Sequence, residues 1–165
     1  MAMHAKYEVM AIAIQDNPFK TKYFCWLDKG LFINLTSPRS INNPANPFTP
    51  QFRLELPFNF STDSVAYTQV SPRNSVLNLT RIIYNNEAWL CGCYFVDEGS
   101  ILMHWTKEYR RATLSMLDNN LMSTDQQVLY YMFNALKPTT KIQTYIGDGR
   151  HNEWFHLGFI SRHVL

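Results

Sequence analysis

The segment at residues 23–30, YFCWLDKG, is the feature that most constrains the fold. Its aromatic and apolar run has Pro18 before it and Gly30 after it, which predicts a fully buried strand. Because the run ends in Asp28, we expect a carboxylate at the edge of an α/β sheet, where loops converge and ligands bind. Such a carboxylate can hold a divalent cation that neutralises a diphosphate. Alternatively, Asp28 caps the following turn or pairs with Lys29.

The rest of the chain alternates between helical and extended patterns. Apolar residues at helical spacing predict helices, and apolar runs bounded by Gly, Pro or Asn predict strands. Ser-Pro and Asn-Pro steps mark residues 37–50 as a long loop. The expected helices cover residues 3–15, 100–117 and 123–137, and the expected strands cover 23–30, 52–56, 65–70, 88–96 and 142–146. Helices that alternate with buried strands predict the α/β class.

Composition limits the classes of function. The chain has 165 residues, of which 46% are hydrophobic, 15% aromatic and 17% charged, so we expect it to fold around a core of its own. The formal net charge of +2 is too small to indicate nucleic acid or an anionic membrane as a partner. No apolar run approaches the roughly 18 residues of a membrane span, so no transmembrane segment is expected.

The cysteines are Cys25, Cys91 and Cys93. An odd count with two cysteines only two positions apart does not match a disulfide framework, and a metal site needs more ligands. We also expect alternation along the strand to point Cys91 and Cys93 to opposite faces. The sequence therefore predicts buried free thiols.

Polar residues elsewhere are candidates for chemistry. Asp125 and Gln126 lie in STDQQ, at the start of the third helix. Asp125 suits either a catalytic carboxylate or N-terminal capping beside Ser123 and Thr124. Gln126 either hydrogen-bonds sugar hydroxyls or faces solvent. His156, in WFHLG, is either a further ligand of a cation held by a carboxylate or a hydrogen-bonded core residue.

In order and spacing, several of these segments resemble the HtrL/YibB family. They are NPF at 17–19, WLDKG at 26–30, the strand CGCYF that contains Gly92, and TDQQ at 124–127. The resemblance covers roughly residues 7–135. That family comprises glycosyltransferases with a nucleotide-diphospho-sugar transferase fold of the GT-A type. The resemblance thus implies a partial GT-A-like mixed sheet flanked by helices.

The resemblance also implies roles for the candidate residues. In GT-A enzymes the acidic motif at a strand end binds the metal that grips the sugar-nucleotide diphosphate, which here assigns Asp28 to a Mn²⁺ or Mg²⁺ ion. Gly92 corresponds to a small residue that lets the donor sugar approach, and Asp125 or Gln126 lies beside that sugar as base or hydroxyl ligand. His156 resembles in position a late histidine that completes the metal shell. The implied partners are a nucleotide sugar and a glycan or protein acceptor.

The position of Asp28 bears on domain organisation. Only 27 residues precede it, whereas the nucleotide-binding part of a GT-A fold lies N-terminal to the acidic motif. We therefore expect residues 1–165 to form a single GT-A-like domain that is the C-terminal portion of a larger one. A Golgi location is expected if an N-terminal anchor precedes it, and sequons permit this location at Asn34, Asn59 and Asn78.

Two other interpretations remain open from the sequence. One is a non-catalytic carbohydrate- or protein-binding module whose aromatic side chains stack on sugars, with candidates Trp89, Trp105, Trp154 and Tyr109. The other is a gene-model fragment without a function of its own.

Overall fold

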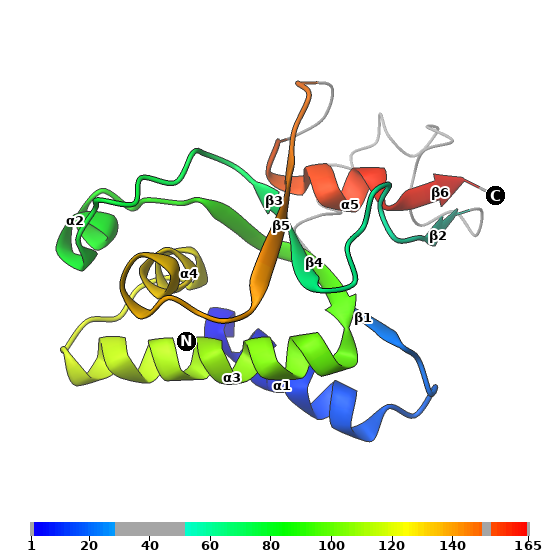
Figure 1. The fold of residues 1–165 in the computed structure, drawn as a ribbon, viewed down its shortest axis with the longest axis horizontal. Helices are drawn as coiled ribbons and strands as arrows, with labels where there is room; N and C mark the ends of the chain where they lie inside the picture. Colours follow the sequence, from blue (N-terminus) through cyan, green and yellow to red (C-terminus); the bar gives the residue numbers. More distant parts are fainter. Residues whose placement is uncertain (1, 29–51, 150–152, 165) are drawn as a thin grey trace.

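The computed structural model describes residues 2–28, 52–149 and 153–164 of the chain. It has the predicted α/β class, with a mixed sheet of four strands flanked by helices (Figure 1). The helices are α1 (Ala2–Asp16), α2 (Leu79–Tyr84), α3 (Gly99–Asp118), α4 (Asp125–Tyr131) and α5 (His156–Ile160), with a π-helical turn η2 (Met132–Leu136) and a 3-10 turn η3 (Glu153–Phe155). The strands are β1 (Tyr23–Leu27), β2 (Phe52–Leu54), β3 (Ser64–Gln69), β4 (Leu90–Glu98), β5 (Lys141–Ile146) and β6 (Arg162–Val164).

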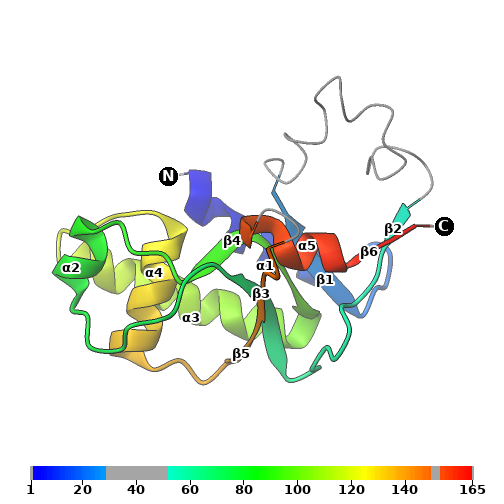
Figure 2. The ribbon, with the colours of Figure 1, turned by 90° about the horizontal axis from the view of Figure 1, so that it is seen from above.

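The four-stranded sheet has the order β1-β4-β3-β5. Strand β4 pairs antiparallel with both β1 and β3, and β3 pairs parallel with β5. Strands β2 and β6 form a separate antiparallel pair near the C-terminus (Figure 2). No helix among the described residues is long and apolar enough to cross a membrane.

A bulge in β4 breaks its register with β3. Tyr67 lies opposite Phe95, but the next residue, Thr68, lies opposite Cys91. The three residues of β4 between these partners, 92–94, therefore have no counterpart on β3. Bulges of this kind bend a strand and redirect its side chains. Here the bulge contains Gly92.

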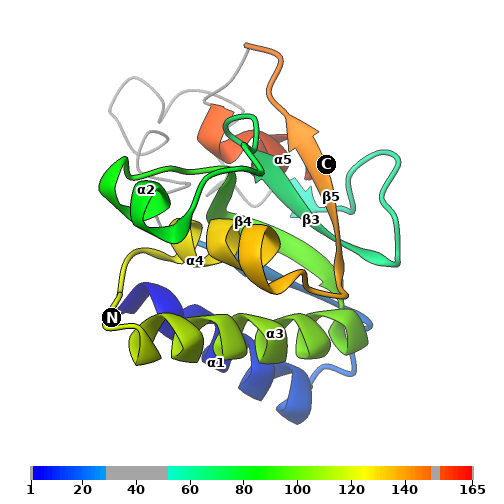
Figure 3. The same cartoon turned by 60° about the vertical axis from the view of Figure 1, so that its left-hand side comes forward.

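The larger core lies between the sheet and the layer formed by α1, α3 and α4, which lie on one side of it (Figure 3). Its centre is aromatic. The ring of Tyr7 stacks between Tyr109 and Phe95, at centroid distances of 3.5 and 5.4 Å. The indole of Trp105 donates a 2.9 Å hydrogen bond to the hydroxyl of Tyr67, so this buried polar pair is satisfied. A smaller core on the other face packs Leu157 of α5 against β3 and β4.

Two predictions about strands and helices need correction. Strand β1 is half-buried rather than fully buried, and Cys25 at its centre is exposed, because β1 lies at the edge of the sheet with β4 as its partner in the four-stranded sheet. Lys29, Gly30 and the expected loop at 37–50 lie outside the described residues. Helix α2 was not expected, since its six residues are too few to show a period; the side chain of Asn78 caps it by accepting from the N–H of Arg81.

Asp97, near the end of β4, is a fully buried carboxyl. Its Oδ1 accepts a 2.7 Å hydrogen bond from the N–H of Glu98, whereas its Oδ2 has no partner. Burial raises the pKa of Asp97 from 3.8 to about 6. The folded chain therefore binds this proton more tightly than the unfolded chain does.

We expect Asp97→Asn to change how stability depends on pH. The protonated Asp97 carboxyl contributes to the free energy of unfolding. This contribution is fully present below pH 3.8, declines as Asp97 ionises in the unfolded chain, and is lost once the pH rises through about 6. The loss is about 3 kcal/mol, since one pKa unit corresponds to about 1.4 kcal/mol. Urea unfolding at several pH values should show that, as the pH rises from 4 to 7, the free energy of unfolding of the variant increases relative to that of the parent chain. A constant difference across that range would contradict the assignment.

Candidate functional site

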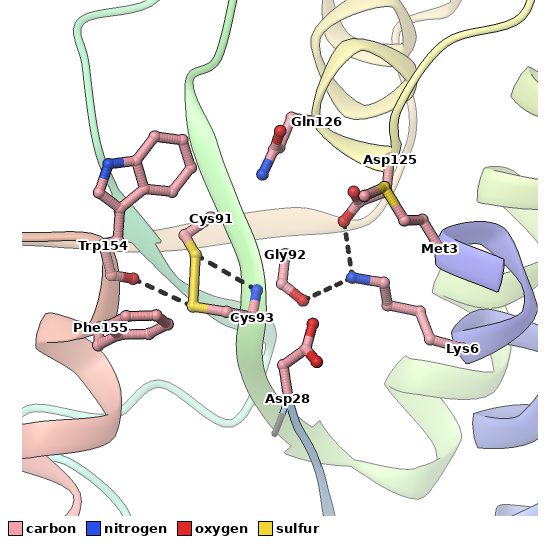
Figure 4. A pocket seen from close by; sticks show the side chains of 10 residues that line it. All are labelled: Met3, Lys6, Asp28, Cys91, Gly92, Cys93, Asp125, Gln126, Trp154 and Phe155. Carbon is pink, nitrogen blue, oxygen red and sulfur yellow. Dashed lines mark hydrogen bonds and ion pairs between the residues drawn. A yellow bond between two sulfur atoms is a disulfide. The ribbon is translucent and has the colours of Figure 1, made fainter. Parts of the chain in front are cut away.

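The candidate site is a cavity of about 400 Å³ at the bulge of β4 (Figure 4). It lies where the starts of α1 and α4, the end of β1 and the η3 turn meet that strand. Its volume falls in the range of about 300–1,000 Å³ that is usual for small-molecule sites. The lining residues are Met3, Lys6, Asp28, Cys91, Gly92, Cys93, Asp125, Gln126, Trp154 and Phe155. Four residues predicted from separate parts of the sequence, Asp28, Gly92, Asp125 and Gln126, thus line one cavity.

A buried ion pair forms one wall of the cavity. The Nζ of Lys6 lies 2.7 Å from Asp125 Oδ2, and the two side chains are only 5% and 4% exposed. The same Nζ donates a 2.8 Å hydrogen bond to the carbonyl of Gly92. A paired charge with an additional hydrogen bond can remain in the interior, whereas either charge alone would be strongly disfavoured. The pair joins α1, β4 and α4 at a single point.

Gly92 is required by this arrangement. A Cβ atom at this position would overlap Asp125 Oδ2 and would lie 2.9 Å from Lys6 Nζ. The structure therefore gives a reason for glycine here that is independent of any ligand. Whether a donor sugar also approaches Gly92 stays a prediction.

Asp125 is the first residue of α4, but it does not cap that helix. The capping box consists of Thr124 and Gln127. The expectation that this segment caps the helix is therefore correct for Thr124 but not for Asp125. The carboxylate of Asp125 is turned instead toward Lys6 of α1. Gln126, the next residue, is half-buried and lines the cavity.

Asp28 directly follows β1, and its backbone N–H donates a 2.7 Å hydrogen bond to the carbonyl of Cys93. This bond continues the pairing of β1 with the bulged part of β4. The side chain is exposed and lies in the cavity, with its carboxylate turned toward Gly92 in Figure 4. The predicted position of Asp28, at the end of a strand and at the edge of the sheet, is therefore confirmed.

Cys91 and Cys93 form a disulfide, so the prediction of free thiols is wrong for this pair. Residues two apart on a strand project from the same face, and their Cα atoms are 5.4 Å apart, within the range that a disulfide spans. The Sγ of Cys93 also lies 3.1 Å from the carbonyl oxygen of Trp154. Cys25 is a free thiol, but it is exposed rather than buried.

His156 is not among the residues that line the cavity, although Trp154 and Phe155 just before it are. It begins α5, is buried, and its Nδ1 has no hydrogen-bond partner. Within the described ranges, no group of three or more His, Cys, Asp or Glu residues could hold a metal ion. The role of His156 as a metal ligand stays a prediction.

Lys6 is the site residue that sequence analysis missed. The sequence did contain an indication of it, because Lys6 places a charge on the apolar face of the first helix. It lies next to Tyr7 and one turn before Met10, and both of these residues are buried. A lysine at such a position is almost never fully buried unless it is paired. The identity of its partner could not be inferred, because Asp125 is 119 residues away in the sequence.

The chain was compared with protein-family models, with curated proteins and with solved structures, and nothing matches it.

We expect Lys6→Met to destabilise the chain by about 3–5 kcal/mol, because it leaves the Asp125 carboxylate buried without a partner. The matched control is Lys141→Met, which breaks an exposed ion pair with Asp63 whose side chains are 70% and 58% exposed. That change should cost at most about 1 kcal/mol. Guanidinium unfolding of both variants measures the difference, and equal small losses would contradict a buried pair.

Gly92→Ala should cost about 1–3 kcal/mol, the usual range for inserting a methyl group into a packed site. The cost should fall when Asp125 is also replaced by Ala, because the oxygen that the new Cβ overlaps is then absent. A double-mutant cycle based on thermal unfolding measures this coupling. Purely additive effects would mean that the strand, and not the carboxylate, requires glycine.

Proposed function

We propose that the cavity binds a nucleotide diphosphate sugar and that the chain is glycosyltransferase-like, transferring the sugar to an acceptor hydroxyl. The observation that carries the proposal is the convergence of Asp28, Gly92, Asp125 and Gln126 on one cavity. These residues come from three of the segments on which the family resemblance rests. The proposal concerns the chemistry of this cavity. We assign no described residue to the part of a sugar-nucleotide site that binds the nucleobase.

The resemblance implies a divalent cation. The cavity can bind such a cation if a single carboxylate from the protein is sufficient. Mg²⁺ is commonly bound through one or two carboxylates, with substrate phosphates and water as the other ligands. Asp28 is the carboxylate that can serve in this way, because Asp125 Oδ2 already pairs with Lys6. A bound cation would offset the negative charge of the diphosphate leaving group.

In the proposed reaction, the acceptor oxygen bonds to the anomeric carbon of the sugar while the bond from that carbon to the diphosphate oxygen breaks. The acceptor proton passes to a carboxylate, and the nucleoside diphosphate leaves with the bonding electrons. We assign this role to Oδ1 of Asp125, because its Oδ2 is paired with Lys6, which holds the carboxylate in a fixed position. The amide of Gln126 can donate to and accept from sugar hydroxyls, which orients the donor.

A second candidate function is carbohydrate binding without transfer, and Trp154 favours it. Its side chain is 41% exposed and lines the cavity. Trp105 and Tyr109, in contrast, are buried in the core, and Trp89 is only 9% exposed. Of the four aromatic residues considered from the sequence, Trp154 is therefore the most exposed, and an exposed indole face can stack on a sugar ring.

The first test is binding of a uridine diphosphate sugar with Mn²⁺, measured by calorimetry on the full chain. Asp28→Ala should weaken binding by at least about 10- to 100-fold, because loss of an outer-shell partner of a metal ligand already costs that much and Asp28 would be a direct ligand. Asp118→Ala, which removes an exposed aspartate at the end of α3, is the charge-matched control and should bind like the parent chain.

Undiminished binding by Asp28→Ala would contradict the role given to that residue. Release of uridine diphosphate in the presence of acceptor would support transfer over simple binding. If the chain binds glycans on an array, and Trp154→Ala abolishes this while no nucleotide sugar binds, the carbohydrate-binding function is favoured instead.

A further inference from the structure

We propose that the disulfide between Cys91 and Cys93 is a thiol–disulfide exchange site that a low-molecular-weight thiol of the glutathione class reaches through the cavity. Both cysteines line that cavity; Cys93 lies in the bulge of β4 and Cys91 directly before it. This chemistry does not depend on the sugar-transfer function proposed above.

The position of the disulfide in the chain argues against a mainly stabilising role. It closes a loop over one intervening residue, Gly92, at a sequence separation of 2. The stabilisation from a cross-link grows with the length of the loop that it closes, so a loop this short restricts the unfolded chain less than a longer loop would. Structural disulfides usually join segments that are distant in sequence. This one joins neighbours that the strand already holds together.

The surroundings of the two sulfur atoms favour attack at Cys93. Cys93 is 9% exposed and Cys91 is 2% exposed, so Cys93 is the less buried residue of the pair. The backbone N–H of Cys93 donates a 3.3 Å hydrogen bond to the Sγ of Cys91. A donor at that distance stabilises negative charge on Cys91 when it leaves as a thiolate, and a stabilised thiolate leaves faster.

The exchange balances in two steps. The external thiolate attacks Cys93 Sγ, forms a mixed disulfide with it and displaces Cys91 as a thiolate. A second external thiolate then attacks the external sulfur of the mixed disulfide, which frees Cys93 and releases the oxidised external disulfide. In total the protein disulfide gains two electrons and two protons, and two external thiols are oxidised. In the reverse direction the same steps re-form the protein disulfide.

The exchange has a structural consequence for the cavity. Gly92 lies inside the ring that the disulfide closes, and its carbonyl accepts the hydrogen bond of Lys6. Reduction opens that ring and removes a constraint on the direction of this carbonyl. The redox state of the cysteines is thereby linked to the wall of the cavity formed by Lys6 and Asp125.

The test is alkylation of the native 165-residue chain followed by intact mass measurement. The air-oxidised chain should take up one label, at Cys25, because the other two cysteines are paired. After equilibration with reduced glutathione, without denaturant, it should take up three labels. In a Cys25→Ser background the count should rise from none to two.

Trapping with oxidised glutathione distinguishes the two sulfur atoms. In the Cys25→Ser background, Cys91→Ser should hold one glutathione as a mixed disulfide at Cys93, and Cys93→Ser should take up several-fold less at the more buried Cys91. Full labelling of the parent chain before reduction would overturn the proposal, since no disulfide would then form. A label count that rises only after denaturant is added would overturn it as well, because the disulfide would then be closed to external thiols.

Discussion

The buried contact between Lys6 and Asp125 determines how the cavity is built. Removing a lysine and an aspartate from water is costly, and their attraction offsets that cost only when the geometry is close and the remaining donors are satisfied. The 2.7 Å separation and the bond to the Gly92 carbonyl meet both conditions. The contact requires the start of α1, the bulge of β4 and the start of α4 to meet at one point. It also excludes a side chain at residue 92.

Local pattern was sufficient for the elements with a strong period. The 20 residues of α3 alternate between core and solvent with helical spacing, and the apolar run of β4 is buried along nearly all of its length. Local pattern could not show which strand lies at the edge. The residues of β1 are as apolar as those of a central strand, and its half-buried state depends on the sheet order, which is set by pairings distant in sequence.

The candidate site was predictable in its members but not in its contacts. Asp28 and Asp125 were selected from their places at a strand end and at a helix start together with the family resemblance, and both line the cavity. That Asp125 pairs with Lys6 depends on tertiary packing across most of the chain. The disulfide was missed for a different reason. The odd number of cysteines argued against a framework of cross-links, and the expectation that Cys91 and Cys93 lie on opposite faces was wrong. The period of a strand is two residues, which places them on the same face.

The contacts that stabilise the cavity also limit what it can bind. Two of the three N–H groups of Lys6 donate to Gly92 and Asp125, so a ligand can gain at most one hydrogen bond from this ammonium without breaking the wall. Asp28, Gln126 and Trp154 supply a carboxylate, an amide and an aromatic face from other sides of the same cavity. A ligand with hydroxyl groups and one apolar face can use all three, because an amide and a carboxylate pair with hydroxyls while the ring covers C–H groups. A sugar, the ligand that we propose, has this chemistry. The internal ion pair therefore fixes one wall of the cavity, and in the proposed function Asp28, Gln126 and Trp154 determine which ligand it prefers.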